Sequence, residues 1–246
     1  MTGFTLTVVD GPPAAGFAAA DAIVSSIAAN PDAAVVVATG RTPAITYGVL
    51  ADRVNAGLDT SALRVFQLDE YVGVGPRDDR SLFGWMDTCF VRPLGIDPAS
   101  VTRFDGLADD LDAVCTGYVR AVRAAGGFDL AILGLGPNGH LGFNEPPSDA
   151  TSPTRVVGLS EASLASNAAY WGEGRVPRSA LTAGMDLLLA ARRVVLIVTG
   201  EAKRDILRRT VTEPPTPSVP ASFLQGHPDV LVIADRAAWG DEDERP

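Results

Sequence analysis

Residues 134–146, GLGPNGHLGFNEP, place a histidine and a carboxylate in one glycine-rich segment. His140 and Glu145 lie in it together, and Asn138 comes just before them. Histidine titrates near neutral pH, and a neighbouring carboxylate can hold its ring in one orientation. The pair therefore suits the transfer of a proton to or from a substrate. The alternative is a glycine-rich turn in which His140 is only packed.

The glycines of this segment also match the G-x-G-x-x-G pattern of dinucleotide-binding folds, at Gly134, Gly136 and Gly139. That motif must open a helix whose N-terminus receives the pyrophosphate. Here HLGFNEPPSD follows, and its two consecutive prolines and its lack of helical periodicity argue against such a helix. We therefore interpret the glycines as allowing a short loop to gather polar side chains around one ligand.

A second carboxylate, Asp69, follows the apolar run LRVFQL at 63–68, at the end of an expected strand. Glu70 and Tyr71 come directly after it. A carboxylate in this position suits abstraction of a proton next to an imine or carbonyl carbon. The alternative is that the acidic pair only ends the strand, because loops carry functional and merely solvated acids alike.

The segment ATGRTP follows another apolar run and offers groups that bind anions. Gly40 frees backbone amides, and Thr39 and Thr42 carry hydroxyls on either side of Arg41. Pro43 suits the first turn of a helix. Because a helix N-terminus attracts negative charge, the segment predicts an anion site.

The elements that must position these residues can be read from the alternation of apolar and amphipathic stretches. Near-continuous apolar runs predict strands covered on both faces, at 4–9, 33–38, 63–68, 128–135, 193–198 and 229–234. Amphipathic stretches predict helices at 14–29, 43–54, 81–93, 111–125, 160–171, 180–190 and 202–211. This alternation predicts one α/β domain over 1–240, with a doubly wound, mainly parallel, Rossmann-like sheet between two helix layers. The acidic end, 241–246, is expected to be a tail.

In doubly wound sheets, ligands bind outside the carboxyl ends of the strands. Four polar clusters fall at such ends: ATGRTP, DEY, GPNGHLGFNEP and TGEAKR. Each cluster alone could be an ordinary turn. Their placement at one edge of the sheet favours an active site.

Composition excludes several classes of function. The net charge of −10 and the pI of about 4.6 argue against binding of nucleic acid or an anionic membrane. Cys89 and Cys115 form no C-x-x-C pair, and no Cys/His spacing indicates a metal site, so both are expected to be free thiols. No signal peptide is recognisable, and no apolar run is expected to approach the length of a membrane span. We therefore expect a cytoplasmic protein, and the sequence leaves a homo-oligomer open.

GLGPNGHLGFNEP resembles the glucosamine-6-phosphate deaminase family, as do ATGRTP at 38–43, LDEYVG at 68–73 and PASFLQGHP at 220–228. The resemblance covers almost the whole chain in the same order, and GHxxFNEP is far more specific than glycine spacing. The related 6-phosphogluconolactonases share the fold but lack the FNEP continuation. The resemblance implies conversion of glucosamine 6-phosphate and water to fructose 6-phosphate and ammonia. It implies no metal or organic cofactor, and a small amino sugar phosphate as the substrate.

The resemblance also implies roles for individual residues. Asp69 matches the base that moves the C2 proton, and His140 matches the acid–base that opens the sugar ring. Glu145 matches the carboxylate that orients His140. Lys203 matches the lysine that binds phosphate together with the ATGRTP segment, whereas a solvated helix lysine is the alternative.

Three positions depart from the pattern of the family. Asn138 stands where the best-known members carry aspartate; an amide can still accept the imidazole N–H, but it favours imidazolium less. Ala169 stands where the family often has a phosphate-binding arginine, whereas Arg41 replaces a small residue in the ATGRTP segment. We hypothesise that Arg41 supplies the missing guanidinium. The alternative is a substrate with a different anionic group or sugar.

Two other functions compete with the deaminase. In a sugar-phosphate lactonase, His140 would activate water and Asp69 would have no C2 proton to move. In a sugar-phosphate sensor, we expect an attached DNA-binding module, whereas this chain starts directly at its first predicted strand. The intact LDEY and FNEP segments favour the deaminase.

Overall fold

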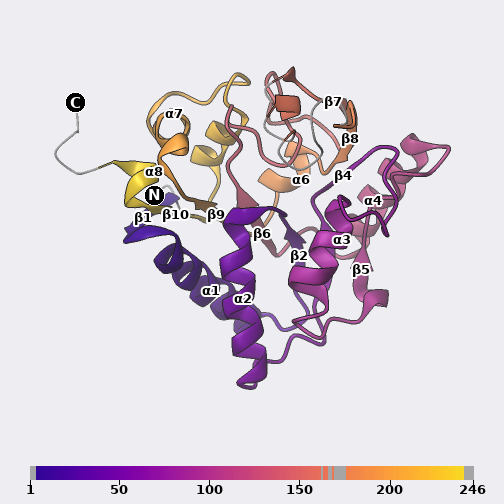
Figure 1. The fold of residues 1–246 in the computed structure, drawn as a ribbon, viewed down its shortest axis with the longest axis horizontal. Coiled ribbons are helices and arrows are strands. Elements are labelled where there is room, and N and C mark those ends of the chain that lie inside the picture. Colours follow the sequence, from indigo (N-terminus) through magenta and orange to yellow (C-terminus); the bar gives the residue numbers. More distant parts are fainter. Residues whose placement is uncertain (1–3, 162, 166–167, 169–175, 241–246) are drawn as a thin grey trace.

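The computed structural model describes residues 4–161, 163–165, 168 and 176–240. Within these ranges, seven parallel strands form the central sheet. Figure 1 shows most of them labelled from left to right in the order in which they pair. The order is β1 (Phe4–Val9), β10 (Val230–Asp235), β9 (Arg193–Val198), β6 (Leu130–Gly134), β2 (Ala34–Val37), β3 (Arg64–Gln67) and β5 (Val101–Thr102).

Helices cover both faces of this sheet, because side chains along each strand alternate between two cores. In β9, Val195 and Ile197 face one core, whereas Val194 and Leu196 face the other. The first core is completed by α1 (Gly11–Ala29), α2 (Arg41–Asn55) and α3 (Leu82–Met86). The second is completed by α4 (Leu111–Ala124), α6 (Met185–Leu189), α7 (Arg204–Thr212) and α8 (Arg236–Trp239). The predicted fold class is confirmed.

A smaller antiparallel sheet, which the sequence analysis did not predict, lies beside the central one. In the described part of the chain it consists of β4 (Asp69–Tyr71), β8 (Ser179–Thr182) and β7 (Arg155–Gly158), in that order. The helix predicted at 180–190 is therefore wrong for its first residues, which form β8, and only α6 is helical. Alanine and leucine favour helices locally, but pairing with strands on both sides overrides this preference.

Other predicted boundaries moved by smaller amounts. The helix predicted at 81–93 is α3 followed by a π-helical turn at Asp87–Val91, and a 3-10 turn at Glu201–Lys203 precedes α7. Residues 161, 163–165 and 168 of the helix predicted at 160–171 are helical, and its other residues from 162 on lie outside the described ones, as does the tail at 241–246. Both cysteines are free and lie in helical segments, as predicted.

Helix α1 corrects one prediction from the sequence. It has 19 residues and a mean hydropathy of 1.2, so by length and composition it is able to cross a membrane. The core helix of a protein without a membrane span passes the same test. In this structure the buried side of α1, including Ile23 and Ile27, packs in the core that it shares with α2 and the central sheet.

Candidate active site

A cavity of about 430 Å³ lies where the four polar clusters meet at the carboxyl ends of the parallel strands. Its lining includes seven of the predicted site residues: Thr39, Gly40, Arg41, Thr42, Asp69, His140 and Lys203. Two predicted residues, Asn138 and Glu145, do not line it. Among the predicted residues, the chain thus brings one acidic, one imidazole and two basic side chains to one cavity from four separate segments.

Asp69 begins β4, directly after the chain leaves β3. Its side chain is almost fully buried, and its Oδ1 atom has no hydrogen-bond partner among the described residues. Burial, together with the negative charge of Glu70, raises the pKa of Asp69 to about 8. A carboxylate with a raised pKa is a stronger base than an ordinary one once it is ionised.

Glu70, the neighbour of Asp69, points into the protein instead of the cavity. Its carboxylate accepts hydrogen bonds from the Ser81 hydroxyl at 2.7 Å and from the backbone amides of Leu82 and Phe83 at 3.1 and 2.9 Å. It also accepts from the Gln67 side chain at 3.1 Å. Glu70 therefore fastens the start of α3 to β4 and holds the backbone that carries Asp69.

His140 lines the cavity, and 16% of its side chain is exposed. Its Nδ1 atom is 3.9 Å from Oε1 of Glu145 and has no hydrogen-bond partner in the described part of the chain. Burial lowers the pKa of His140, the negative charge of Glu145 opposes this effect, the positive charge of Lys203 adds to it, and the resulting pKa is about 4. The imidazole is therefore neutral at pH 7 and able to accept a proton.

Glu145 lies behind His140 and contacts a segment far along the chain. Its carboxylate accepts hydrogen bonds from the backbone amide of Ser160 at 2.6 Å and from the hydroxyl of Ser163. The 3.9 Å to His140 is longer than a hydrogen bond. Glu145 thus stands between the imidazole and the start of the helical segment after Ser160.

Asn138 makes a different contact from the one considered in the sequence analysis. Its Oδ1 atom accepts a hydrogen bond from the backbone amide of His140 at 3.3 Å. Among the described residues, no hydrogen bond joins Asn138 to the imidazole ring. This local side-chain-to-backbone contact is typical of asparagine in turns, and it shapes the loop instead of polarising the histidine.

Two positions of this loop require glycine, because neighbouring atoms lie too close to leave room for a side chain. A Cβ atom at Gly136 would lie 2.1 Å from Cδ2 of His140, so the ring rests directly on the Gly136 backbone. Gly142 has a φ of +59°, and a Cβ atom there would lie 3.0 Å from Oγ1 of Thr182. In the described residues the next element after the loop is the strand β7 (Arg155–Gly158), not a helix, which agrees with the rejection of a dinucleotide motif.

The basic end of the cavity is formed by two loops that precede helices. Gly40, with a φ of +108°, ends the loop before α2, and the exposed side chain of Arg41 makes no hydrogen bond or ion pair with any described residue. Lys203 is half-buried, and burial lowers its pKa. Asp235 holds the turn before Lys203 by accepting a hydrogen bond from the amide of Gly200 at 3.0 Å.

The cavity has one further basic residue that the sequence analysis missed. Arg80 lines it and donates to both carboxylate oxygens of Asp78, at 2.8 and 2.7 Å. Only its position in a loop between two elements could have pointed to it. In the described ranges, no group of three or more His, Cys, Asp or Glu side chains is arranged to hold a metal ion.

Comparisons with known proteins agree on one family. The model of the family described as glucosamine-6-phosphate isomerases/6-phosphogluconolactonase matches residues 14–233. A glucosamine-6-phosphate deaminase of Cutibacterium acnes is 45% identical, with 92% of this chain and 87% of the relative covered. One of Rhodopirellula baltica is 43% identical, with 91% and 90% covered.

Solved structures extend the comparison to the fold. A monomeric glucosamine-6-phosphate deaminase superposes with a TM-score of 0.92 at 33% identity, covering 97% of this chain and 98% of the other. A 6-phosphogluconolactonase of Trypanosoma brucei, at 22% identity and a TM-score of 0.78, covers 97% and 98% and shares the fold. The cavity-lining motifs, the matched sequence and the superposed fold agree, and the chain belongs to the family of glucosamine-6-phosphate isomerases and 6-phosphogluconolactonases.

Proposed function

We propose that this chain is a glucosamine-6-phosphate deaminase, which converts glucosamine 6-phosphate and water to fructose 6-phosphate and ammonia. The observation that carries the proposal is the pairing of a buried Asp69 and a neutral His140 in one cavity, with Arg41 and Lys203 at its basic end. Curated relatives of that name, at 38–45% identity over most of the chain, support it.

Ring opening is the first step, and we assign it to His140. The neutral imidazole takes the proton of the anomeric hydroxyl and delivers it to the ring oxygen, so that the C1–O5 bond breaks and the open-chain aldehyde forms. The transient imidazolium is stabilised by the charge of Glu145. A histidine that is neutral at pH 7 already has the protonation state that ring opening requires.

Proton transfer from C2 to C1 follows, and we assign it to Asp69. The ammonium group of the substrate, held beside Asp69, favours the ionised carboxylate. The carboxylate removes the C2 proton while the aldehyde oxygen takes a proton from the ammonium group, which gives a 1,2-enolamine. The protonated Asp69 then delivers its proton to C1, and an iminium group is left at C2. Water adds to the imine carbon and ammonia departs, which gives the ketone. Each of these steps balances without an oxidant or reductant.

The phosphate is assigned to the basic end of the cavity, at the start of α2 and beside Lys203. The first amides of α2 have no partner within the helix, and a helix of this length attracts an anion at that end. Burial lowers the pKa of Lys203, and a bound phosphate would supply a partner that favours its charged form.

Replacement of Arg41 by alanine tests the hypothesis that this residue grips the phosphate. A guanidinium binds two phosphate oxygens at once, and a charge-assisted bond contributes about 1.5–3 kcal/mol. We expect the KM for the sugar phosphate to rise at least about tenfold, with weaker inhibition by inorganic phosphate. Arg53→Ala, on the same helix but paired with Asp21, is the control. An unchanged KM and unchanged phosphate inhibition would place Arg41 in solvent.

Ammonia release from glucosamine 6-phosphate tests the proposed function itself. The same assay with galactosamine 6-phosphate decides the epimer, and hydrolysis of 6-phosphogluconolactone tests the lactonase alternative. We expect ammonia from the gluco isomer and little lactone hydrolysis, because the site is arranged around a base for C2 proton transfer, a step that lactone hydrolysis does not include. Lactone hydrolysis without ammonia release would overturn the proposal. The cytoplasmic location and a homo-oligomer stay proposals, to be tested by cell fractionation and by the mass in solution.

A further inference from the structure

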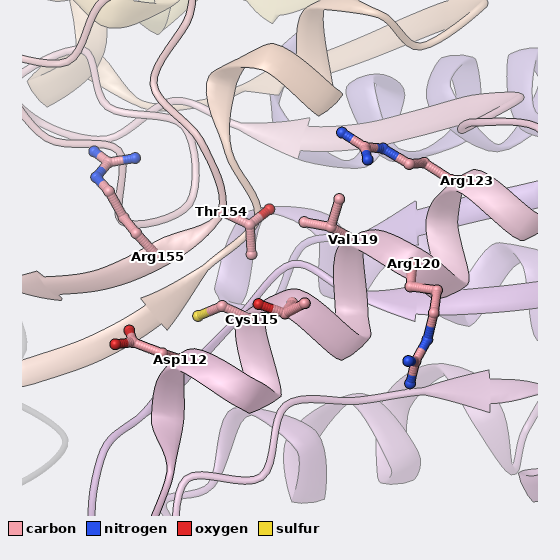
Figure 2. Close-up of a pocket in the computed structure, with 8 residues that line it drawn as sticks. Asp112, Cys115, Val119, Arg120, Arg123, Thr154 and Arg155 are labelled. Carbon is pink, nitrogen blue, oxygen red and sulfur yellow. The ribbon is translucent and has the colours of Figure 1, made fainter.

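A second cavity, of about 580 Å³, lies between α4 and the residues that lead into β7. Arginines line it from two sides: Arg120 and Arg123 on α4, and Arg155 at the start of β7. Figure 2 shows that the guanidinium groups of Arg120 and Arg155 point away from each other. Arg120 and Arg123 are exposed, whereas Arg155 is bonded to the loop that carries Glu145.

Arg155 holds this loop at two points, one on each side of Glu145. Its Nη1 atom donates a hydrogen bond to Oδ1 of Asn144 at 2.9 Å, and its Nη2 atom donates to Oγ of Ser148 at 2.9 Å. The Ser148 hydroxyl in turn donates to the carbonyl oxygen of Glu145 at 2.5 Å. The residue before Glu145 and its own carbonyl are therefore both tied to one guanidinium.

Asn144 connects the hydrogen bonds of Arg155 to two further backbone carbonyl groups. Its side chain is fully buried, and its Nδ2 atom donates to the carbonyl oxygens of Leu141 at 3.0 Å and Ala183 at 2.7 Å. With Arg155 on its oxygen, this amide uses both of its N–H groups and its acceptor. The loop after His140 is thus fixed to the end of β8, and Arg155 is the donor that satisfies the Asn144 oxygen among the described residues.

We propose that Arg155 is a positioning residue that sets the place of the Glu145 carboxylate beside His140, acting through Asn144 and Ser148. This inference rests on the proposed function, since Glu145 matters there through the imidazole. The 3.9 Å between Glu145 and His140 leaves an interaction that is sensitive to small displacements of the loop. A misplacement of about 1 Å in such a pair can cost about 10²-fold in rate.

Arg155→Ala is expected to lower kcat for ammonia release at least about tenfold, with KM changed by less than about twofold. The KM is kept because the residues assigned to the phosphate lie on other elements. Arg155→Lys should fall between parent and Arg155→Ala, because an ammonium reaches fewer of the acceptors than a guanidinium does. The matched control is Arg120→Ala, which removes a guanidinium from the same cavity and should leave kcat unchanged.

A double-mutant cycle with Glu145→Gln separates positioning from general destabilisation. If Arg155 acts through Glu145, Arg155→Ala costs far less in the Glu145→Gln background than in the parent. An equal loss of kcat in both backgrounds, or no loss in the parent, would overturn the proposal. If Arg155→Ala does not fold, the same cycle is run with Arg155→Lys, and the same outcomes support or overturn the proposal.

A readout without substrate keeps this test apart from the proposed function. The Ser160 amide donates to Glu145, so a displaced carboxylate should speed hydrogen exchange at Ser160 in the free enzyme. We expect faster exchange in Arg155→Ala and Arg155→Lys but not in Arg120→Ala. Unchanged exchange contradicts the positioning role, whereas a parent enzyme that releases no ammonia contradicts only the proposed function.

Discussion

Asp69→Asn is expected to lower kcat for ammonia release by at least about 10²-fold, while the fold and substrate binding are kept. The carboxamide has the shape of the carboxylate but is too weak a base to remove the C2 proton. Its amide would occupy the same buried position at the start of β4. Thermal unfolding and inhibition by inorganic phosphate measure the fold and the binding. Near-parental ammonia release by a pure variant would remove Asp69 from the role of base.

The pH dependence of the parent enzyme tests the same assignment. Because burial raises the pKa of Asp69 to about 8 and a base must be ionised, kcat/KM should rise with pH through about 8. His140, with a pKa near 4, stays neutral across this range and adds no second limb. Asp79→Asn, which changes an exposed carboxylate at the cavity, should keep the limb. A profile that is flat between about pH 6 and 9 would contradict Asp69 as the base.

His140→Gln is expected to lower kcat for the cyclic substrate by about 10²-fold, and to affect an open-chain analogue much less. Glutamine is able to form hydrogen bonds but cannot shuttle a proton between the anomeric hydroxyl and the ring oxygen. The measurement is the ratio of the two kcat values in parent and variant. Equal losses for both substrates would move His140 to binding or to the later proton transfer.

The second histidine supplies the control for this experiment. Nε2 of His227 lies 2.7 Å from the carbonyl oxygen of Ala191, and its Nδ1 accepts from the amide of Asp229 at 3.1 Å. It is buried and does not line the cavity. His227→Gln should therefore lower the melting temperature and leave the ratio of cyclic to open-chain turnover unchanged.

The central sheet was predictable because its strands are buried on both faces and read as apolar runs. Strand β9 was predicted with the bounds that it has, and β2 and β10 to within a residue at each end. Strand β8 was not predictable in the same way, because Ser179–Thr182 becomes a strand only by pairing with β4 and β7. The local sequence is enough to predict a strand that is buried on both faces, whereas a strand such as β8 is determined by its long-range pairing.

The residues of the candidate site were also predictable only in part. Residues at the carboxyl ends of parallel strands, such as Asp69 and Lys203, could be placed in one cavity from the order of elements alone. The contacts of Glu145 with Ser160, and of Asn144 with Arg155, follow no spacing rule, because they join segments through the fold. Ala169 lies outside the described residues, so its exchange with Arg41 stays a hypothesis.

The boundary between the two sheets has an evolutionary consequence. Asp69 is the first residue of the small sheet, whereas the loops with Arg41 and Lys203 extend from strands of the large one. Mutations in the small sheet are therefore able to alter the proposed base without disturbing the two loops that we assign to the phosphate. Selection can act on the two ends of a substrate almost independently, which lets one inherited scaffold diversify its chemistry while it keeps a preference for phosphorylated compounds.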